Sequence, residues 1–341
     1  MTGDPPGASG FAIGNDEQYR PVQAVGDQRV RIGRGAGGDG SGAGEGTGGG
    51  DGGGGLLACH ASHALEDPPR ARGPRLIVVH GALRDSDRYL AYARDAARRS
   101  GADPLIVAPQ FLADVDITAR DGIPGGALRW EVEGWKGGYP AVGPAPVSSF
   151  SAMDGLLDQL TAGLPAGRDP AVVMFGNSAG GQFVNRYATV GRGPDVLAGR
   201  GLAVRFVIAN PSTYLYFDRE RPVAVRDNTA VNRWRYGFDQ APPYVDAGPR
   251  PSLERYLARD VTIVLGALDH DRGSRLLEVS PPAMAQGANR LDRGLRYHQH
   301  VRRLARAAGL PARHRLIQLA GVGHAAADVL AAAPVREVIF G

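Results

Sequence analysis

The residues best suited to chemistry in this 341-residue chain surround a serine. Ser178 is the centre of Gly176-Asn177-Ser178-Ala179-Gly180, which matches the pattern G-x-S-x-G. The apolar run 171–175 precedes the pattern, and a segment with helical patterning follows it. A reactive serine on such a tight turn between a strand and a helix requires small residues two positions away on either side. The pattern therefore predicts Ser178 as a nucleophile.

The backbone near this serine could stabilise negative charge on a substrate oxygen. The N–H of Ala179 comes next in the chain, where the dipole of the predicted helix favours an anion. A second N–H is expected from the loop that follows the apolar run 76–79, donated by Ala82 or Leu83. His80 begins this loop, and we expect it to order the loop by hydrogen bonding rather than to transfer protons.

A base for the serine is expected after the last predicted strand. His324 follows Gly321-Val322-Gly323 at that position, and a helical pattern begins beyond it. A neutral imidazole can accept the serine proton near neutral pH and return it to the leaving group. His298 and His300 are two residues apart on a predicted helix and would point to nearly opposite faces, so we expect no shared metal site there.

The acid that orients the histidine should follow the predicted strand 261–265. Asp269 is four residues beyond the end of that strand and is our preferred candidate, with Asp271 as the alternative. A carboxylate in this role holds the imidazole tautomer and stabilises the imidazolium. The order serine, aspartate, histidine is that of α/β-hydrolases and differs from the orders in chymotrypsin and subtilisin.

Short apolar runs alternate with helical patterns along most of the chain. The strands are continuous rather than alternating in hydrophobicity, as is typical of a parallel sheet covered on both faces. They are predicted at 76–79, 105–108, 171–175, 205–209, 261–265 and 316–319, and helices at 87–99, 151–160, 180–190, 289–308 and 325–333. This order predicts a doubly wound, mostly parallel α/β fold whose ligand binds at the carboxyl ends of the strands. Ser151 is the expected N-cap of the second helix, and Pro334 is expected to end the last one.

The chain divides into two parts of different composition. Residues 34–54 are almost entirely glycine with small and acidic residues, which bury too little apolar surface to offset their ordering entropy. The residues before them show no clear periodicity. We therefore predict a disordered Gly-rich tail over 1–70 and a single catalytic domain over 71–341.

Two long connections hold most of the domain's aromatic residues. One covers 110–150, and the other covers 211–259, at the position where an α/β-hydrolase carries its cap. Loops of this length in a compact domain are usually functional. We predict an aromatic-rich cap insertion at about 211–259 that lines the space above the serine and suits an acyl or aromatic ester.

Composition excludes several classes of partner. The net charge is +4, Lys136 is the only lysine, and the arginines are scattered among 35 acidic residues, which argues against nucleic-acid binding. No apolar run is long enough for a membrane span, and the N-terminus lacks the order of a signal peptide. Cys59 is the only cysteine, so no internal disulfide can form. A cytoplasmic location is the expectation, and the oligomeric state is left open.

Residues 74–341 resemble the α/β-hydrolase superfamily, and in particular bacterial members similar to polyhydroxyalkanoate depolymerases and feruloyl esterases. The residues that carry the resemblance are the run Phe175–Val184 with Arg186-Tyr187, then Gly266-Ala267-Leu268-Asp269, Gln286-Gly287, Arg290, Arg293-Gly294, and Gly321-Val322-Gly323-His324. The resemblance implies Ser178 as nucleophile, Asp269 as acid and His324 as base, with no cofactor.

These observations predict a carboxylic ester hydrolase that acts on a small-molecule ester or acyl substrate through an acyl-enzyme intermediate. The same residues could instead transfer the acyl group to another alcohol or amine. A non-catalytic binding protein of this fold is the alternative from another class, but such proteins usually lose a member of the triad, and all three positions are filled here.

Overall fold

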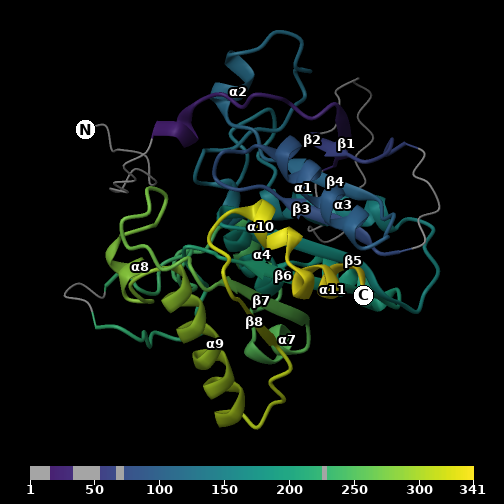
Figure 1. Cartoon of the computed structure of the whole chain (residues 1–341). Helices are drawn as coiled ribbons and strands as arrows, with labels where there is room; N and C mark the ends of the chain where they lie inside the picture. Colours follow the sequence, from purple (N-terminus) through teal and green to yellow (C-terminus); the bar gives the residue numbers. More distant parts are fainter. Residues whose placement is uncertain (1–15, 34–53, 67–72, 225–228) are drawn as a thin grey trace, which may run out of the picture.

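The computed structural model describes residues 16–33, 54–66, 73–224 and 229–341, and its centre is one sheet (Figure 1). In the described residues the sheet has eight strands in the order β1-β2-β4-β3-β5-β6-β7-β8. β3 to β8 are parallel, whereas β2 pairs antiparallel with both β1 and β4. The strands are β1 (Gln28–Ile32), β2 (Gly55–Ala61), β3 (Arg75–Val79), β4 (Ile106–Gln110), β5 (Arg168–Asn177), β6 (Leu202–Ala209), β7 (Asp260–Gly266) and β8 (Arg315–Leu319). The predicted mostly parallel α/β fold is confirmed.

Helices cover both faces of the sheet. Side chains of β3 alternate between the two faces, so that Leu76 and Val78 pack in one core cluster while Ile77 and Val79 pack in the other. The first cluster includes α1 (Ser86–Arg99), α10 (Ala326–Ala331) and α11 (Ala333–Phe340). The second includes α3 (Ser149–Thr161), α4 (Ala179–Val190), α5 (Gly193–Gly199), α7 (Leu253–Leu257) and α9 (Arg290–Ala307). Burial on both faces explains why the strands are continuously apolar.

The remaining helical segments are short and lie in the connections. They are η1 (Asp16–Tyr19), α2 (Asp114–Thr118), η2 (Trp135–Gly137), α6 (Pro243–Asp246) and α8 (Pro281–Met284). No helix among the described residues has the length and apolar character that a membrane crossing requires.

The prediction that residues 1–70 form one disordered tail is wrong for two segments. β1 and β2 extend the sheet beyond β4, and the side chains of Val30, Ile32 and Leu57 are buried in the core. A long Gly-rich stretch separates these two strands in the chain, and no helical pattern lies between them, so their sequence does not show the alternation of strands and helices that identifies the rest of the sheet. The Gly-rich residues 34–53 lie outside the described residues.

A buried ion pair connects the segment before β1 to the rest of the domain. Arg84 and Asp116 are both fully buried and paired at 2.7 Å. The same Arg84 guanidinium donates to the carbonyls of Gln18 and, at 2.8 Å, of Arg20. Asp116 also accepts the backbone N–H of Val22 at 2.9 Å. These bonds tie the N-terminal segment to the loops that follow β3 and β4.

Two predicted helix boundaries are wrong. α3 begins at Ser149, because the hydroxyl of Ser148, not Ser151, accepts the N–H of Phe150 at 3.1 Å as an N-cap. Pro334 does not end the helical region, because it lies in the first turn of α11, where its missing N–H has no partner to lose.

Candidate active site

Ser178 lies on the turn between β5 and α4 with a strained backbone. Its φ is 60° and its ψ is −119°, a left-handed region that is costly for a residue with a side chain. The surrounding glycines make the turn possible: a Cβ on Gly176 would lie 2.3 Å from the carbonyl oxygen of Gly180. A Cβ on Gly180 would lie 2.3 Å from the carbonyl oxygen of Val79. The predicted turn is therefore present, and it packs directly against the end of β3.

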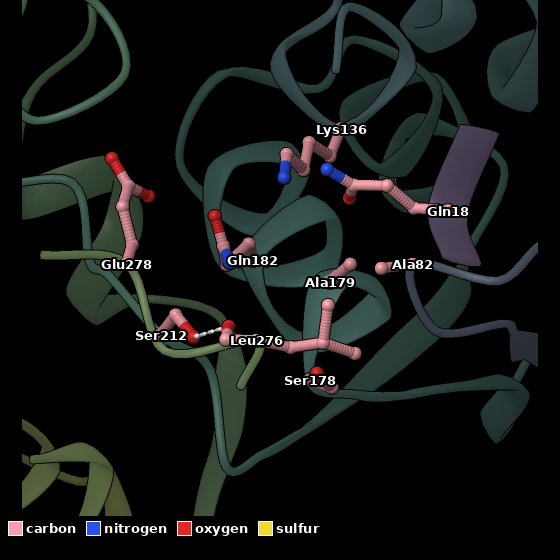
Figure 2. A pocket seen from close by; sticks show the side chains of 9 residues that line it. All are labelled: Gln18, Ala82, Lys136, Ser178, Ala179, Gln182, Ser212, Leu276 and Glu278. Carbon is pink, nitrogen blue, oxygen red and sulfur yellow. Dashed lines mark hydrogen bonds between the residues drawn. The ribbon is translucent and has the colours of Figure 1, made fainter. Parts of the chain in front are cut away.

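This close packing brings the loop after β3 beside the serine. Ala82 lines the same pocket as Ser178 and Ala179, whereas Leu83 is not among the residues that line it (Figure 2). Ala179 is the first residue of α4, so its N–H belongs to the helix N-terminus. Two of the three residues expected to supply oxyanion donors, Ala82 and Ala179, therefore line the pocket beside Ser178.

His324 and Asp269 are in direct contact. Nδ1 of His324 lies 2.7 Å from Oδ2 of Asp269, which is buried in the loop after β7. Asp271 is exposed, and its Oδ1 accepts the backbone N–H of Gly273 at 2.8 Å. Of the two candidate acids, only Asp269 meets the histidine.

Two asparagines connect the histidine loop to the serine turn. Asn177, which precedes Ser178, donates from Nδ2 to the carbonyl of His324 at 3.1 Å. Asn210 follows β6, donates to Oδ1 of Asn177 at 3.3 Å, and accepts the N–H of Gly266 at 2.9 Å. These bonds join the carboxyl ends of β5, β6 and β7 and fix the backbone from which the three candidate residues project.

Arg290 provides a buried positive charge behind the acid. Its Nη1 lies 3.4 Å from Oδ1 of Asp269 and 2.9 Å from the hydroxyl of Ser274, and its Nε donates to Ser212 at 3.1 Å. Burial lowers the pKa of this arginine, and the neighbouring Asp269 opposes that shift. The arrangement holds the carboxylate so that its other oxygen faces His324.

His80 has the ordering role expected of it. Its Nδ1 lies 2.8 Å from the carbonyl oxygen of Gly81, and its Nε2 accepts the N–H of Phe111 at 3.0 Å. These bonds require the proton on Nδ1 and leave the ring neutral. Complete burial lowers the pKa of His80 to about 4, so this imidazole connects the loops after β3 and β4 in its neutral form.

The pocket beside the serine is polar, so the prediction of an aromatic lining is wrong. Its lining residues are Gln18, Ala82, Lys136, Ser178, Ala179, Gln182, Ser212, Leu276 and Glu278 (Figure 2). The aromatics of the two long connections pack inside the domain instead, as when Trp135 stacks on Phe111 with ring centroids 5.1 Å apart. Each connection still contributes to the pocket, the first through Lys136 and the second, 211–259, through Ser212.

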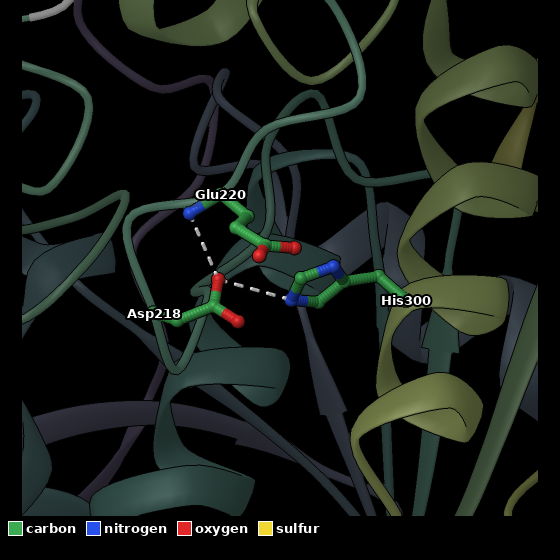
Figure 3. Close-up of side chains that lie close together, drawn as sticks. All are labelled: Asp218, Glu220 and His300. Atoms are coloured by element: carbon green, nitrogen blue, oxygen red, sulfur yellow. Dashed lines mark hydrogen bonds and ion pairs between the residues drawn. The ribbon is translucent and has the colours of Figure 1, made fainter. Parts of the chain in front are cut away.

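A second cluster of polar side chains lies between α9 and the connection after β6. Asp218, Glu220 and His300 each offer a ligand atom within 4.8 Å of the others (Figure 3). The guanidinium of Arg303 already pairs with Glu220 at 2.6 Å and contacts Nδ1 of His300 at 2.9 Å. His298 contacts the carbonyl of His314 instead, so the two histidines have different partners. We assign the cluster to the docking of α9.

Solved structures share this architecture. Poly(aspartic acid) hydrolase-1 from Sphingomonas sp. KT-1 superposes with a TM-score of 0.59 at 22% identity, covering 83% of this chain and 93% of that one. A poly(3-hydroxybutyrate) depolymerase from Bordetella parapertussis superposes with a TM-score of 0.53 at 24% identity, covering 79% of this chain and 81% of that one. The chain has the α/β-hydrolase fold. No protein-family model and no curated protein sequence matches it.

Several residues around Ser178 were not predicted from the sequence. Asn210 directly follows β6, so the rule that polar groups gather at the carboxyl ends of strands could have identified it. Lys136 was visible as the only lysine, but its place beside the serine depends on a long connection. Nothing in the sequence indicated that Gln18 lies in the pocket, because it belongs to the segment that was predicted to be a disordered tail.

Proposed function

We propose that this protein is a carboxylic ester hydrolase that uses Ser178, His324 and Asp269 as a catalytic triad. The observation that carries the proposal is the 2.7 Å contact between His324 and Asp269 at the sheet edge that also carries Ser178 on a strained turn. The fold shared with known hydrolases supports the class of reaction, and the site residues support the chemistry.

In the first half of the reaction Ser178 forms an ester with the acyl group. Nε2 of His324 takes the proton of the serine hydroxyl as Oγ attacks the carbonyl carbon. Asp269 accepts the Nδ1 proton, which keeps Nε2 free as the base and stabilises the imidazolium. The N–H groups of Ala179 and of the Ala82–Leu83 loop stabilise the oxyanion. The imidazolium then protonates the departing alcohol.

In the second half a water molecule replaces the alcohol. His324 takes a proton from the water as its oxygen attacks the acyl carbon, and returns the proton to Oγ of Ser178 as the carboxylic acid leaves. Every step uses side chains and backbone groups of this chain, so the proposed reaction needs no cofactor.

Labelling with a fluorophosphonate probe tests the nucleophile. We expect the wild-type protein to be labelled and Ser178→Ala not to be labelled. Ser212→Ala, which removes the other serine hydroxyl of the pocket, should still react. A wild-type protein that is not labelled and does not turn over 4-nitrophenyl butyrate, or equal labelling of Ser178→Ala, would overturn the proposal.

A further inference from the structure

Three nitrogen donors converge on the pocket beside Ser178. They are Nζ of Lys136 and the side-chain amides of Gln18 and Gln182 (Figure 2). All three side chains are at least nine-tenths buried. The proposed reaction does not use any of them, so their presence around the nucleophile requires another explanation.

The amide of Gln182 is oriented by its neighbours. Its Oε1 lies 3.1 Å from Nη2 of Arg186, which can only donate. The hydroxyl of Thr213 accepts from the same Nη2 at 2.9 Å and donates to Oε1 of Gln182 at 3.2 Å. These bonds occupy the oxygen and fix the orientation of the amide, so the side of Gln182 left for the pocket is its NH₂ group.

Gln18 brings a donor that lacks an acceptor within the described part of the chain. Its side chain is 1% exposed, it lines the pocket, and its Nε2 has no hydrogen-bond partner among the residues that the structure describes. Leaving a buried amide donor unsatisfied destabilises the folded protein, so the position is explained if a ligand supplies the acceptor. The ion pair between Arg84 and Asp116 holds the segment that carries this glutamine, since Arg84 also binds the carbonyl of Gln18.

The charges around the pocket leave positive charge in excess. Glu133 is shared between Lys136 at 2.6 Å and Arg235 at 3.2 Å. Arg186 is fully buried, and its four hydrogen bonds go to neutral oxygens: two backbone carbonyls, the amide of Gln182 and the hydroxyl of Thr213. Glu278, on the side of the pocket away from Gln18 in Figure 2, accepts from the hydroxyls of Tyr236 and Ser280. The formal charges of these three cations and two carboxylates sum to +1.

We propose that the pocket binds a carboxylate of the substrate through Nζ of Lys136 and the amide nitrogens of Gln18 and Gln182. This inference rests on the proposed function and names its substrate class: esters that carry a free carboxylate a few atoms from the reacting carbonyl. A carboxylate supplies the acceptor that Gln18 lacks and balances the excess charge. Burial lowers the pKa of Lys136 against the opposing effect of Glu133, and a second anion at Nζ favours its charged form.

Matched ester pairs test the substrate class. On the acyl side, the monoanion 4-nitrophenyl hemiglutarate is compared with its neutral methyl-ketone isostere, 4-nitrophenyl 5-oxohexanoate. On the alcohol side, 4-(butyryloxy)butanoate is compared with 5-(butyryloxy)pentan-2-one. We expect kcat/KM to be about tenfold or more higher for the anionic ester than for the neutral ester in one of the two pairs. One charged hydrogen bond to the substrate is sufficient for a difference of this size. Equal values in both pairs would overturn the proposal.

Variants of the donors connect the preference to this pocket. In Lys136→Met the ratio of kcat/KM between anionic and neutral ester should fall about tenfold, while Arg235 still pairs with Glu133. In Gln18→Leu the ratio should fall about threefold to tenfold, since a neutral donor is lost. Arg98→Met removes an exposed cation from α1 and should leave the ratio unchanged. If Lys136→Met does not fold, the ratio of kcat/KM in Gln18→Leu is sufficient to test the carboxylate site.

The outcomes separate this inference from the proposed function. Hydrolysis that depends on Ser178 but shows no preference for the anion refutes the carboxylate site and leaves the hydrolase intact. A ratio that is the same in Gln18→Leu and in the wild type also refutes it. Calorimetry measures the binding of monomethyl glutarate to Ser178→Ala, in which no turnover occurs. Weaker binding when Gln18→Leu is added to Ser178→Ala supports the carboxylate site, and no binding to Ser178→Ala contradicts it.

Discussion

The imidazole of His324 and the carboxylate of Asp269 meet at 2.7 Å although 55 residues separate them in the chain. Asp269 is also bound from behind by Arg290 at 3.4 Å, and the backbone of His324 is bound by Asn177, the neighbour of Ser178. The two partners of the pair are thus each held by a residue that has no part in the proposed proton transfer.

Replacing Asp269 with asparagine should nearly abolish turnover. The amide cannot hold the Nδ1 proton and stabilise the imidazolium, and the loss in kcat should be about 10⁴-fold, with little change in KM. Asp271→Asn is the matched control, because Asp271 is exposed and its carboxylate accepts the backbone N–H of Gly273. Steady-state kinetics on one 4-nitrophenyl ester measures both; a large loss in Asp271→Asn alone would transfer the role to Asp271.

Replacing Gly180 with alanine should disrupt the serine turn. The new Cβ would lie 2.3 Å and 2.6 Å from the backbone carbonyls of Val79 and His80, neither of which can move freely within the sheet edge. We expect a loss of about 1–3 kcal/mol in the free energy of unfolding and a strong decrease in fluorophosphonate labelling.

The control for this glycine is Gly199→Ala at the end of α5. A Cβ there meets nothing within 4 Å, so stability should change by less than about 1 kcal/mol. Urea unfolding of both variants measures the difference, and equal stability of Gly180→Ala and the wild type would contradict the tight packing at the turn.

Removing the carboxylate of Asp116 should be strongly destabilising. Asp116→Ala leaves the guanidinium of Arg84 buried without its anion and removes the acceptor for Val22, at an expected cost of about 3–5 kcal/mol. Because Arg84 also holds Gln18, the pocket should lose part of its wall. Asp95→Ala, at an exposed pair on α1, should leave the melting temperature unchanged. Thermal unfolding followed by circular dichroism compares them.

Stability should fall as the pH is lowered below neutral. Burial lowers the pKa of His80 to about 4, so between this value and its ordinary value of 6.5 the unfolded chain binds a proton that the folded chain excludes. The contribution is fully present above pH 6.5 and is lost toward pH 4, at up to about 1.4 kcal/mol per pH unit.

His80→Gln should make the free energy of unfolding less dependent on pH in that window, whereas His63→Gln, at an exposed position, should not. Urea unfolding at pH 7 and pH 5 measures the two slopes. His314, whose pKa burial also lowers to about 4, should contribute part of the slope that remains. A slope in His80→Gln identical to that of the wild type would show that His80 is not buried as a neutral ring.

The sequence alone determined the parallel sheet and the positions of Ser178, Asp269 and His324. These are local properties: β3 to β8 each contain a short, mostly apolar run, and each candidate residue lies within five residues of the end of such a run. Parallel strands end at the same edge of a sheet, so residues distant in the chain could be predicted to meet without knowledge of their contacts.

Only the tertiary structure decided which groups surround the serine. β1 pairs with β2, and β2 pairs with β4, which lies about 50 residues further along the chain, so the place of both strands in the sheet depends on contacts that are distant in sequence. The aromatics of the long connections could equally have lined a pocket or filled a core, because burial of apolar surface is favourable in both places. In the folded chain these aromatics are packed in the core, and Gln18, Lys136 and Gln182 line the pocket. Long-range packing and buried ion pairs, such as that of Arg84 with Asp116, determine this arrangement.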